Sequence, residues 1–286
     1  MLEPKLYLCA TPIGNLEDIT LRVVRTLGEV DCVYAEDTRR SGALLKHLGL
    51  QKPLFSCHTH NEAKRAEEIV QKVKAGERVA YVSDAGLPGI SDPGERLVAA
   101  CIRENVLFEV LPGASAPLLA LVMSGLPVQN ACFAGFLPRE TKERRECLAK
   151  LSRHPGTLLF YESPLRIKAT LDELYETYGE RPAALMRELT KLHEEAVRGT
   201  LSSLAARYAE EPPKGECVLA VGGVSETDAV EAAPERLEEY ILQLLNRGVS
   251  AKDAAKQASA VLDVPRNEAY ALALKLKEGE HGGPGF

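Results

Sequence analysis

Short apolar runs alternate with segments of helical spacing through about the first 125 residues, and this alternation strongly constrains the fold. The runs expected to form strands are Lys5–Ala10, Val30–Ala35, Leu54–Ser56, Val79–Val82 and Val106–Leu111. Between them, apolar residues recur every three or four positions, as on one face of a helix. The segment Glu62–Lys74 is a clear example. Strands that alternate with helices in this way are typical of a parallel, doubly wound α/β sheet.

Small, rigid loops follow three of the predicted strands, at residues 11–15, 84–94 and 112–117. The loop at 84–94 holds three glycines and two prolines. Glycine lets a backbone approach a ligand closely, and proline reduces the entropy lost on binding. Ligands of open α/β sheets bind at the carboxyl ends of the strands. We therefore expect a compact ligand here, with Asp84 as a hydrogen-bond acceptor; the alternative is that Asp84 caps the next helix.

The sequence lacks the common signatures of nucleotide-phosphate sites and of zinc sites. The first loop, Thr11-Pro12-Ile13-Gly14-Asn15, is neither G-x-G-x-x-G nor a Walker sequence, so a pyrophosphate cradle is not expected. Metal-type side chains gather at Cys57-His58-Thr59-His60, but their spacing matches no zinc signature. No metal site is predicted.

The charge pattern leaves two interpretations of one segment. The net charge is −6, which does not indicate nucleic acid but allows a local basic face. Residues 139–154 hold six basic side chains against three glutamates: Arg139, Lys142, Arg144, Arg145, Lys150 and Arg153. The segment is either a solvated amphipathic helix or a phosphate contact.

The rest of the chain changes character twice. After Gly125-Leu126-Pro127, further strands and helices indicate a mixed α/β layer up to Val221. A weakly patterned linker at 224–233 precedes three helical segments that resemble a helix-turn-helix module. We therefore predict an N-terminal doubly wound α/β domain at 1–125, a second mixed α/β domain at 126–225 and a helical C-terminal module at 234–279.

Cysteine usage and hydropathy bear on the compartment. The seven cysteines are scattered and odd in number, which is typical of free thiols in a reducing compartment. Met1 leads almost directly into a strand, so no signal peptide is expected. No apolar run approaches the ~18 residues of a membrane span. These features predict a cytoplasmic protein.

Several long motifs, in order, carry a family resemblance. They are Thr11–Thr20, Ala35–Arg39, Ser83–Gly94, Pro112–Ala116, Tyr161–Pro164 and Arg187–Lys191. With them the chain resembles the tetrapyrrole methylase superfamily, whose members bind S-adenosylmethionine between two α/β domains. It is most similar to a branch that methylates the ribose 2′-hydroxyl of a decoding-region cytidine in 16S rRNA. The resemblance covers nearly the whole chain.

The resemblance implies a fold, a donor site and partners. The fold is two α/β domains with the donor site between them, plus a small all-helical C-terminal module. The residues expected to line the S-adenosylmethionine site are Thr11, Pro12, Asp84, Leu87, Ile90, Ser115, Ala116 and Tyr161. The expected partners are 16S rRNA, within the small ribosomal subunit, and a second copy of the chain in a homodimer.

A small-molecule alternative stays open, in which the chain methylates a tetrapyrrole or corrin intermediate. Tetrapyrrole-modifying members usually have a first loop rich in glycine and aspartate, whereas this chain has Thr-Pro-Ile-Gly-Asn. The first loop, the basic segment and the C-terminal helices favour RNA.

The expected chemistry is methyl transfer to a ribose oxygen, which is a weak nucleophile that benefits from a positioned base. No catalytic signature singles out that base. The candidates at predicted strand ends are Glu36, Asp37, His58, His60, Glu162 and Glu188. The side chains expected to contact phosphates are Arg39, Arg40, Arg166, Arg187 and Lys191, since such charges hold single-stranded RNA.

Overall fold

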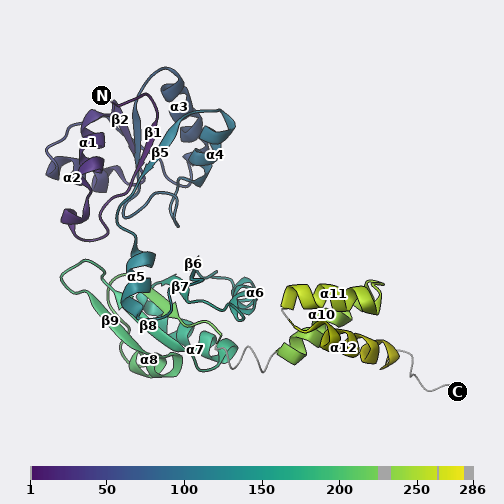
Figure 1. The fold of residues 1–286 in the computed structure, drawn as a ribbon. Helices are drawn as coiled ribbons and strands as arrows, with labels where there is room; N and C mark the ends of the chain where they lie inside the picture. Colours follow the sequence, from purple (N-terminus) through teal and green to yellow (C-terminus); the bar gives the residue numbers. More distant parts are fainter. Residues whose placement is uncertain (1, 225–232, 263, 280–286) are drawn as a thin grey trace. The chain divides into compact units, whose positions relative to one another are not determined.

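The computed structural model describes residues 2–224, 233–262 and 264–279. The chain divides after Gly223 into two compact units, and each is described by itself. The first unit contains two β-sheets and the second contains helices (Figure 1). Two α/β layers and a helical C-terminal region were both predicted, and this fold class is confirmed.

The first sheet is parallel throughout, in the order β3-β2-β4-β1-β5. Its strands are β1 (Leu6–Cys9), β2 (Cys32–Ala35), β3 (Leu54–Ser56), β4 (Val79–Val82) and β5 (Phe108–Leu111). Its helices are α1 (Leu21–Glu29), α2 (Thr38–His47), α3 (Glu62–Lys74) and α4 (Glu95–Arg103), with a short 3-10 turn η1 at Leu16–Asp18. Figure 1 shows α1 and α2 on one side of the strands and α3 and α4 on the other. The predicted doubly wound sheet is confirmed.

Burial on both faces explains why these strands read as continuous apolar runs. Leu6 and Leu8 pack against α3 and α4, while Tyr7 and Cys9 face α1 and α2. All four are at most 2% exposed, because helices cover both sides of the sheet. Alternate residues of a strand point to opposite faces, so each run supplies both cores.

Side-chain caps set where the helices begin. The Thr20 hydroxyl accepts a hydrogen bond from Val23 N, so Thr20 caps α1. Helix α2 begins at Thr38. The reason is that the Asp37 carboxylate accepts from Arg39 N and forms the N-cap.

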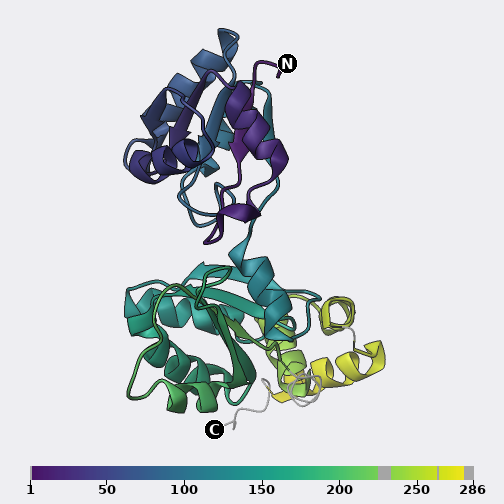
Figure 2. The same cartoon turned by 90° about the vertical axis from the view of Figure 1, so that its left-hand side faces the viewer.

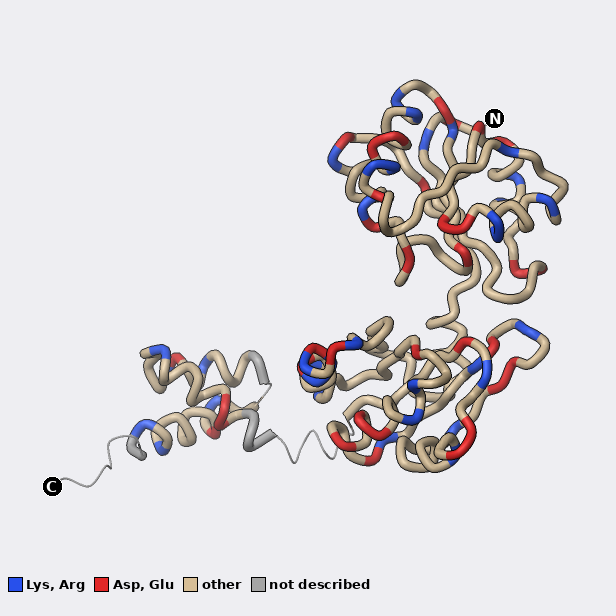
Figure 3. The backbone as a smooth tube through the Cα atoms, turned by 180° about the vertical axis from the view of Figure 1, so that it is seen from behind, with Lys and Arg blue, Asp and Glu red and all other residues tan. Residues whose placement is uncertain are grey.

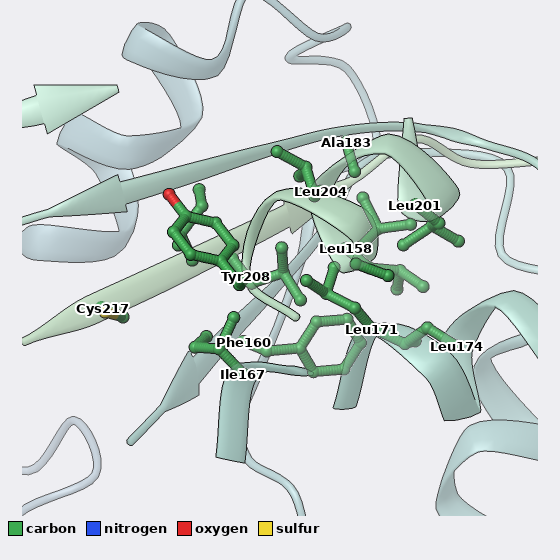
Figure 4. Packing of buried hydrophobic residues seen from close by; sticks show 14 of the residues in the cluster. Leu158, Phe160, Ile167, Leu171, Leu174, Ala183, Leu201, Leu204, Tyr208 and Cys217 are labelled. Atoms are coloured by element: carbon green, nitrogen blue, oxygen red, sulfur yellow. The ribbon is translucent and has the colours of Figure 1, made fainter. Parts of the chain in front are cut away.

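The second sheet is mixed, in the order β6-β7-β10-β8-β9. Its strands are β6 (Cys132–Phe136), β7 (Leu158–Glu162), β8 (Pro182–Arg187), β9 (Glu195–Thr200) and β10 (Cys217–Val221). The β6–β7 pair is parallel and the other three pairs are antiparallel. Helices α6 (Thr141–Leu151), α7 (Ile167–Tyr178) and α8 (Leu201–Arg207) and the 3-10 turn η2 (Pro164–Arg166) complete the layer (Figure 2). Figure 4 shows the packing of α7 and α8 residues against Leu158 and Phe160.

Helix α5 (Ala116–Ser124) connects the two sheets. It follows β5 of the first sheet, but Ala120 and Leu121 pack on the second sheet against Leu159, Met186 and Ala220. The helix therefore lies within the range predicted for the first domain and packs on the layer predicted as the second. The three domain boundaries stay predictions.

The C-terminal unit consists of α10 (Ala233–Asn246), α11 (Ala251–Leu262) and α12 (Arg266–Gly279). Its core contains five alanines besides Leu237 and Ile241, which lets the helices approach closely: Ala251, Ala255, Ala258, Ala269 and Ala273. The Ser250 hydroxyl accepts from Asp253 N and caps α11. Most of the predicted linker lies outside the described residues. Among those that are described, no helix combines the length and apolar character needed to cross a membrane.

Candidate active site

The first and second rigid loops of the first sheet, at 11–15 and 84–94, are joined by backbone hydrogen bonds. Thr11 and Gly86 pair in both directions, with N···O distances of 2.9 and 3.0 Å. The buried Thr11 hydroxyl also donates to the carbonyl of Ser83, at 3.2 Å. Gly86 has φ +83°, which glycine adopts without strain. The loops that follow β1 and β4 therefore form one rigid surface, as the parallel topology predicts.

Gly14 brings this surface against the second sheet. A Cβ at Gly14 would lie 2.5 Å from Lys191 Cγ and 2.8 Å from the Thr190 hydroxyl. The next residue, Asn15, donates its backbone N–H to that hydroxyl at 3.1 Å. No other residue type fits at position 14 without movement, so the close approach depends on glycine.

A cavity of about 360 Å³ lies where these elements meet. Its lining is largely apolar and combines Ile13, Ile90 and Ala116 with Tyr161 and Leu189 of the second layer. Cavities that hold small molecules typically measure roughly 300–1,000 Å³ and have a few polar groups on apolar walls. This cavity has the size and character of a site for a compact organic ligand.

Three of the eight residues predicted to bind the donor line this cavity, namely Ile90, Ala116 and Tyr161. The others, Thr11, Pro12, Asp84, Leu87 and Ser115, lie outside its lining but next to it in sequence or in the same loops. Thr11 is only 3% exposed, so it supports the loop rather than presenting its side chain. The assignment of the eight residues to a donor site stays a prediction.

Asp84 holds two loops together. Its carboxylate accepts from Asp37 N at 3.0 Å and lies 3.6 Å from the Arg40 guanidinium. The alternative role as a cap of α4 is wrong, since α4 has Gly94 as its N-cap residue and no side-chain cap hydrogen bond from it. The orphan amides of that helix are satisfied instead by Glu62, which accepts from Gly94 N and Arg96 N at 2.8 and 3.1 Å.

Among the residues that line the cavity, Asp92 has a pKa raised far above its usual value. Burial raises its pKa to about 7, and the nearby carboxylates of Glu36 and Asp84 add to the effect. Its side chain makes no hydrogen bond or ion pair with any residue that the structure describes. A carboxylate with a pKa near neutrality can accept and release protons under working conditions, which suits general acid–base chemistry.

The six predicted base candidates occupy different environments. Glu36 has a buried, unpartnered Oε2, and burial followed by the charge of Asp84 raises its pKa. A hydrogen bond from Arg39 lowers the pKa of Asp37 to about 2. His58 and His60 lie 6.0 Å apart between ring centroids and outside the cavity lining.

The last two candidates, Glu162 and Glu188, already form hydrogen bonds with other residues. Glu162 lines the cavity but is 3% exposed and accepts from Thr170 Oγ1 and Ser163 N, each at 2.8 Å. Glu188 pairs with Lys191 at 2.8 Å, and that hydrogen bond lowers its pKa. Sequence reasoning therefore missed Asp92, although it belongs to the same Ser83–Gly94 motif. The available signal was that this rigid loop holds a second carboxylate besides Asp84.

The five side chains predicted to contact phosphates are all paired with acidic side chains. Each pairs with a carboxylate: Arg39 with Asp37, Arg40 with Asp84, Arg166 with Glu162, Arg187 with Glu195, and Lys191 with Glu188 and Glu216. Arg39 and Arg40 are the most exposed, with 89% and 68% of their side chains accessible. Figure 3 shows basic and acidic residues interspersed along the chain. Their role in RNA binding stays a prediction.

The basic segment forms α6, but its six charges are not equivalent. Arg144 is 6% exposed and bonds to Glu173 and to the Thr170 hydroxyl, so it supports the fold. Arg139, Lys142, Arg145 and Lys150 are exposed. Within the described chain, no group of three or more His, Cys, Asp or Glu side chains could hold a metal ion.

Comparison with known proteins gives consistent matches in both units. Residues 5–205 match the family model described as Tetrapyrrole (Corrin/Porphyrin) Methylases, and residues 231–277 match the RsmI C-terminal HTH domain. A Synechocystis protein named Ribosomal RNA small subunit methyltransferase I is 42% identical over 273 residues, covering 95% of this chain and 98% of that protein. A Bacillus subtilis protein of the same name is 41% identical, covering 93% and 92%.

Solved structures share the fold at lower identity. The methyltransferase CobJ has a TM-score of 0.59 at 20% identity, covering 77% of this chain and 94% of that one. Uroporphyrin-III C-methyl transferase from Thermus thermophilus, complexed with S-adenyl homocysteine, has a TM-score of 0.54 at 21% identity, covering 76% and 97%. These structures show the shared fold, and the family models and the relatives at 41–42% identity show that the chain is a methyltransferase of the tetrapyrrole methylase family, in the branch of ribosomal RNA small subunit methyltransferase I.

Proposed function

We propose that the chain transfers a methyl group from S-adenosylmethionine to the ribose 2′-hydroxyl of a decoding-region cytidine in 16S rRNA. The observation that carries the proposal is the cavity bounded by the rigid loops, in which the Asp92 carboxylate has no partner among the described residues. The names of the relatives that cover over 90% of this chain support ribosomal RNA as the substrate.

S-adenosylmethionine is the methyl donor of this family, as predicted. When bound, it supplies a methyl group on a positively charged sulfur. The residues present fit such a group, because apolar walls from Ile13, Ile90 and Leu189 accompany three carboxylates, Asp92, Glu162 and Glu216, around one cavity. Alignment of donor and acceptor provides much of the acceleration in such a transfer.

The proton balance of the reaction assigns a role to Asp92. Transfer to the ribose would form a C–O bond on the acceptor and break the C–S bond of the donor, which would leave as a neutral thioether. The hydroxyl proton must leave the acceptor oxygen, and the Asp92 carboxylate takes it and later releases it to water. Its raised pKa suits this task at neutral pH.

RNA is preferred over the tetrapyrrole alternative. The likeness to tetrapyrrole and corrin enzymes is 19–24% in identity and omits about a quarter of this chain. The rRNA-methyltransferase relatives are 41–43% identical over more than 90% of it. We further propose that the chain acts in the cytoplasm, on 16S rRNA that is already part of the small ribosomal subunit.

A homodimer is also part of the proposal, and α5 supports it. This helix is apolar around its circumference, yet Leu118 and Val122 on its outer face are 62% and 74% exposed. A helix that is hydrophobic all round is normally buried. Light scattering should show a dimer, and Leu118→Asp with Val122→Asp should shift it to monomer; an unshifted mass would exclude this face.

Labelled S-adenosylmethionine offered with small subunits that lack the modification tests the main proposal. Free 16S rRNA and a tetrapyrrole are the competing acceptors. We expect label in the rRNA of the subunit, retained on a ribose after nuclease digestion. Label on a base would overturn the 2′-oxygen assignment, and label on the tetrapyrrole alone would overturn the RNA substrate.

A further inference from the structure

A second cavity adjoins the donor cavity and was assigned no role above. It measures about 740 Å³ and lies between the end of β6, the start of α6 and the start of α7. Phe136, Glu162 and Ser163 line both cavities, so the two meet at these residues. A group held in the second cavity is therefore next to the site of methyl transfer.

A bulge in β6 turns an aromatic ring toward this junction. Residues three apart in a regular strand point to opposite faces, so Phe133 and Phe136 would diverge. The pairing with β7 shifts register between Phe133 and Gly135, where Gly135 has φ +67°. The extra residue puts both rings beside Tyr161, at centroid distances of 5.0 and 5.2 Å. Bulges that re-aim a side chain occur frequently next to active sites.

Phe136 is packed on one side only. Its side chain is 60% exposed despite its contact with Tyr161. Burial of such a ring is favourable, so an exposed phenylalanine at the junction of two cavities leaves room for a flat, apolar partner. A nucleobase satisfies this description, because single-stranded bases stack on aromatic side chains.

Positive charge lies at the rim of the same cavity. Arg139 is exposed and makes no hydrogen bond or ion pair with the described residues. Arg166 lies 3.5 Å from both Glu162 and the Pro138 carbonyl, which leaves guanidinium donors available. By contrast, the buried Arg144 is bonded to Glu173 and Thr170 in the floor. The rim of the cavity therefore carries guanidinium groups that can bind an anion, while the arginine in its floor is already paired.

We propose that the second cavity holds the target nucleotide, with its base stacked on Phe136 and a neighbouring phosphate bound by Arg139 and Arg166. The inference rests on the proposed function and adds a nucleotide subsite to it. A base held there brings its ribose to the opening shared with the donor cavity. Unpairing of the target base is needed, as in other enzymes that modify a single nucleotide.

The test compares Phe136→Ala with Phe136→Tyr, which keeps an aromatic face. Small subunits lacking the modification are the acceptor, and donor affinity is measured by calorimetry. We expect kcat/KM of Phe136→Ala to fall about five- to 150-fold, the range for loss of one base stack. Because Phe136 also lines the donor cavity, the fall in kcat/KM should be larger than any fall in donor affinity. Phe136→Tyr should stay near wild type.

Arg139→Ala and Arg145→Ala form the matched pair for the rim. Both remove an exposed arginine, but only Arg139 lines the cavity. We expect Arg139→Ala to raise KM and to reduce the salt dependence of RNA binding by up to ~0.7 in slope, the value for one single-strand phosphate contact. Arg145→Ala should change neither.

The outcomes separate the subsite from the proposed function. If wild type methylates the subunits and Phe136→Ala does so equally well, the subsite is wrong and the function stands. A parallel loss of donor affinity in Phe136→Ala would also overturn the subsite. If wild type transfers no methyl group to rRNA, the function fails, and the nucleotide subsite fails with it.

Discussion

At the scale of single residues, Asp92 is the side chain on which the chemistry depends most. We predict that Asp92→Asn lowers the rate of methyl transfer at pH 7–8 by roughly 10²–10⁴-fold, the usual contribution of a general base. In wild type the rate should rise with pH through about 7, the pKa of Asp92. Single-turnover rates over pH 5.5–8.5 measure this, and the variant should lack the rise.

Asp92→Asn is predicted to slow the reaction but to stabilise the fold at pH 8. Because the folded pKa of Asp92 is raised above its unfolded value, stability falls as pH rises from about 4 to about 7 and stays low above that. Asp92→Asn should therefore have a higher Tm than wild type at pH 8 and the same Tm near pH 4. The control Glu95→Gln, an exposed neighbour, should leave rate and Tm unchanged. A slower but less stable Asp92→Asn would indicate a structural role instead.

Substitution of Asp84 is predicted to weaken binding of the donor and not binding of RNA. Asp84→Ala removes the acceptor of Asp37 N and the partner of Arg40. The predicted hydrogen bond between the donor and the Asp84 carboxylate is lost as well. Loss of a charge-assisted hydrogen bond costs ~1.5–3 kcal/mol, so donor affinity should weaken roughly ten- to a hundredfold. Calorimetry measures the affinity for the donor, and filter binding at several salt concentrations measures the affinity for RNA.

Arg39→Ala combined with Arg40→Ala serves as the comparison for Asp84→Ala. It should spare the donor and weaken RNA binding, since both guanidinium groups are exposed. Because Arg40 lies beside Asp84, a small loss of donor affinity is compatible with this scheme. Equal losses in both assays for the two variants would contradict the division between a donor cavity and a phosphate-binding rim.

At the scale of elements, α3 holds the loop at 84–94 against the cavity. Glu62 is 6% exposed and accepts from Gly94 N and Arg96 N at the start of α4. Glu62→Ala leaves the backbone amides of Gly94, which is buried, and Arg96 without their acceptor, which costs about 1–3 kcal/mol. Tm should fall by roughly 2–4 °C for each kcal/mol, and donor affinity should fall too.

Glu62→Gln keeps a carbonyl oxygen at the same place, so it should restore most of both quantities. Glu67→Ala, on the exposed side of the same helix, is the control for helix propensity. Thermal unfolding followed by circular dichroism and donor calorimetry give the two readouts. Full donor affinity in Glu62→Ala would show that the loop keeps its shape without this anchor.

At the scale of the whole molecule, the C-terminal unit is predicted to serve the substrate rather than the donor. Residues up to Gly223 form a compact unit of their own, and the three C-terminal helices have a separate core. Removing residues from Glu231 onward should leave donor affinity unchanged and raise KM for small subunits. Loss of donor binding by a truncated chain that still folds would place the C-terminal helices in the donor site.

Much of the architecture could be predicted from the sequence, because it depends on short-range patterns. Apolar runs such as Val79–Val82, buried on both faces, indicated the parallel sheet, and Thr20 and Ser250 are caps whose effect is local. The motifs that suggested the family are contiguous, so they could be read without coordinates. The three rigid loops were expected to converge, and Thr11 and Gly86 are hydrogen-bonded to each other.

What only the tertiary structure decided involves contacts between residues far apart in the chain. The acidity of Asp92 depends first on its burial and then on charges that include Glu36 from another loop, and Arg166 donates to the carbonyl of Pro138. Phe136 faces the cavities because one extra residue in β6 changes its face, which alternation along a strand cannot predict. Burial and charge at a point in space sum over all surrounding elements, so sequence alone determined the elements, while folding determined which side chains share a site.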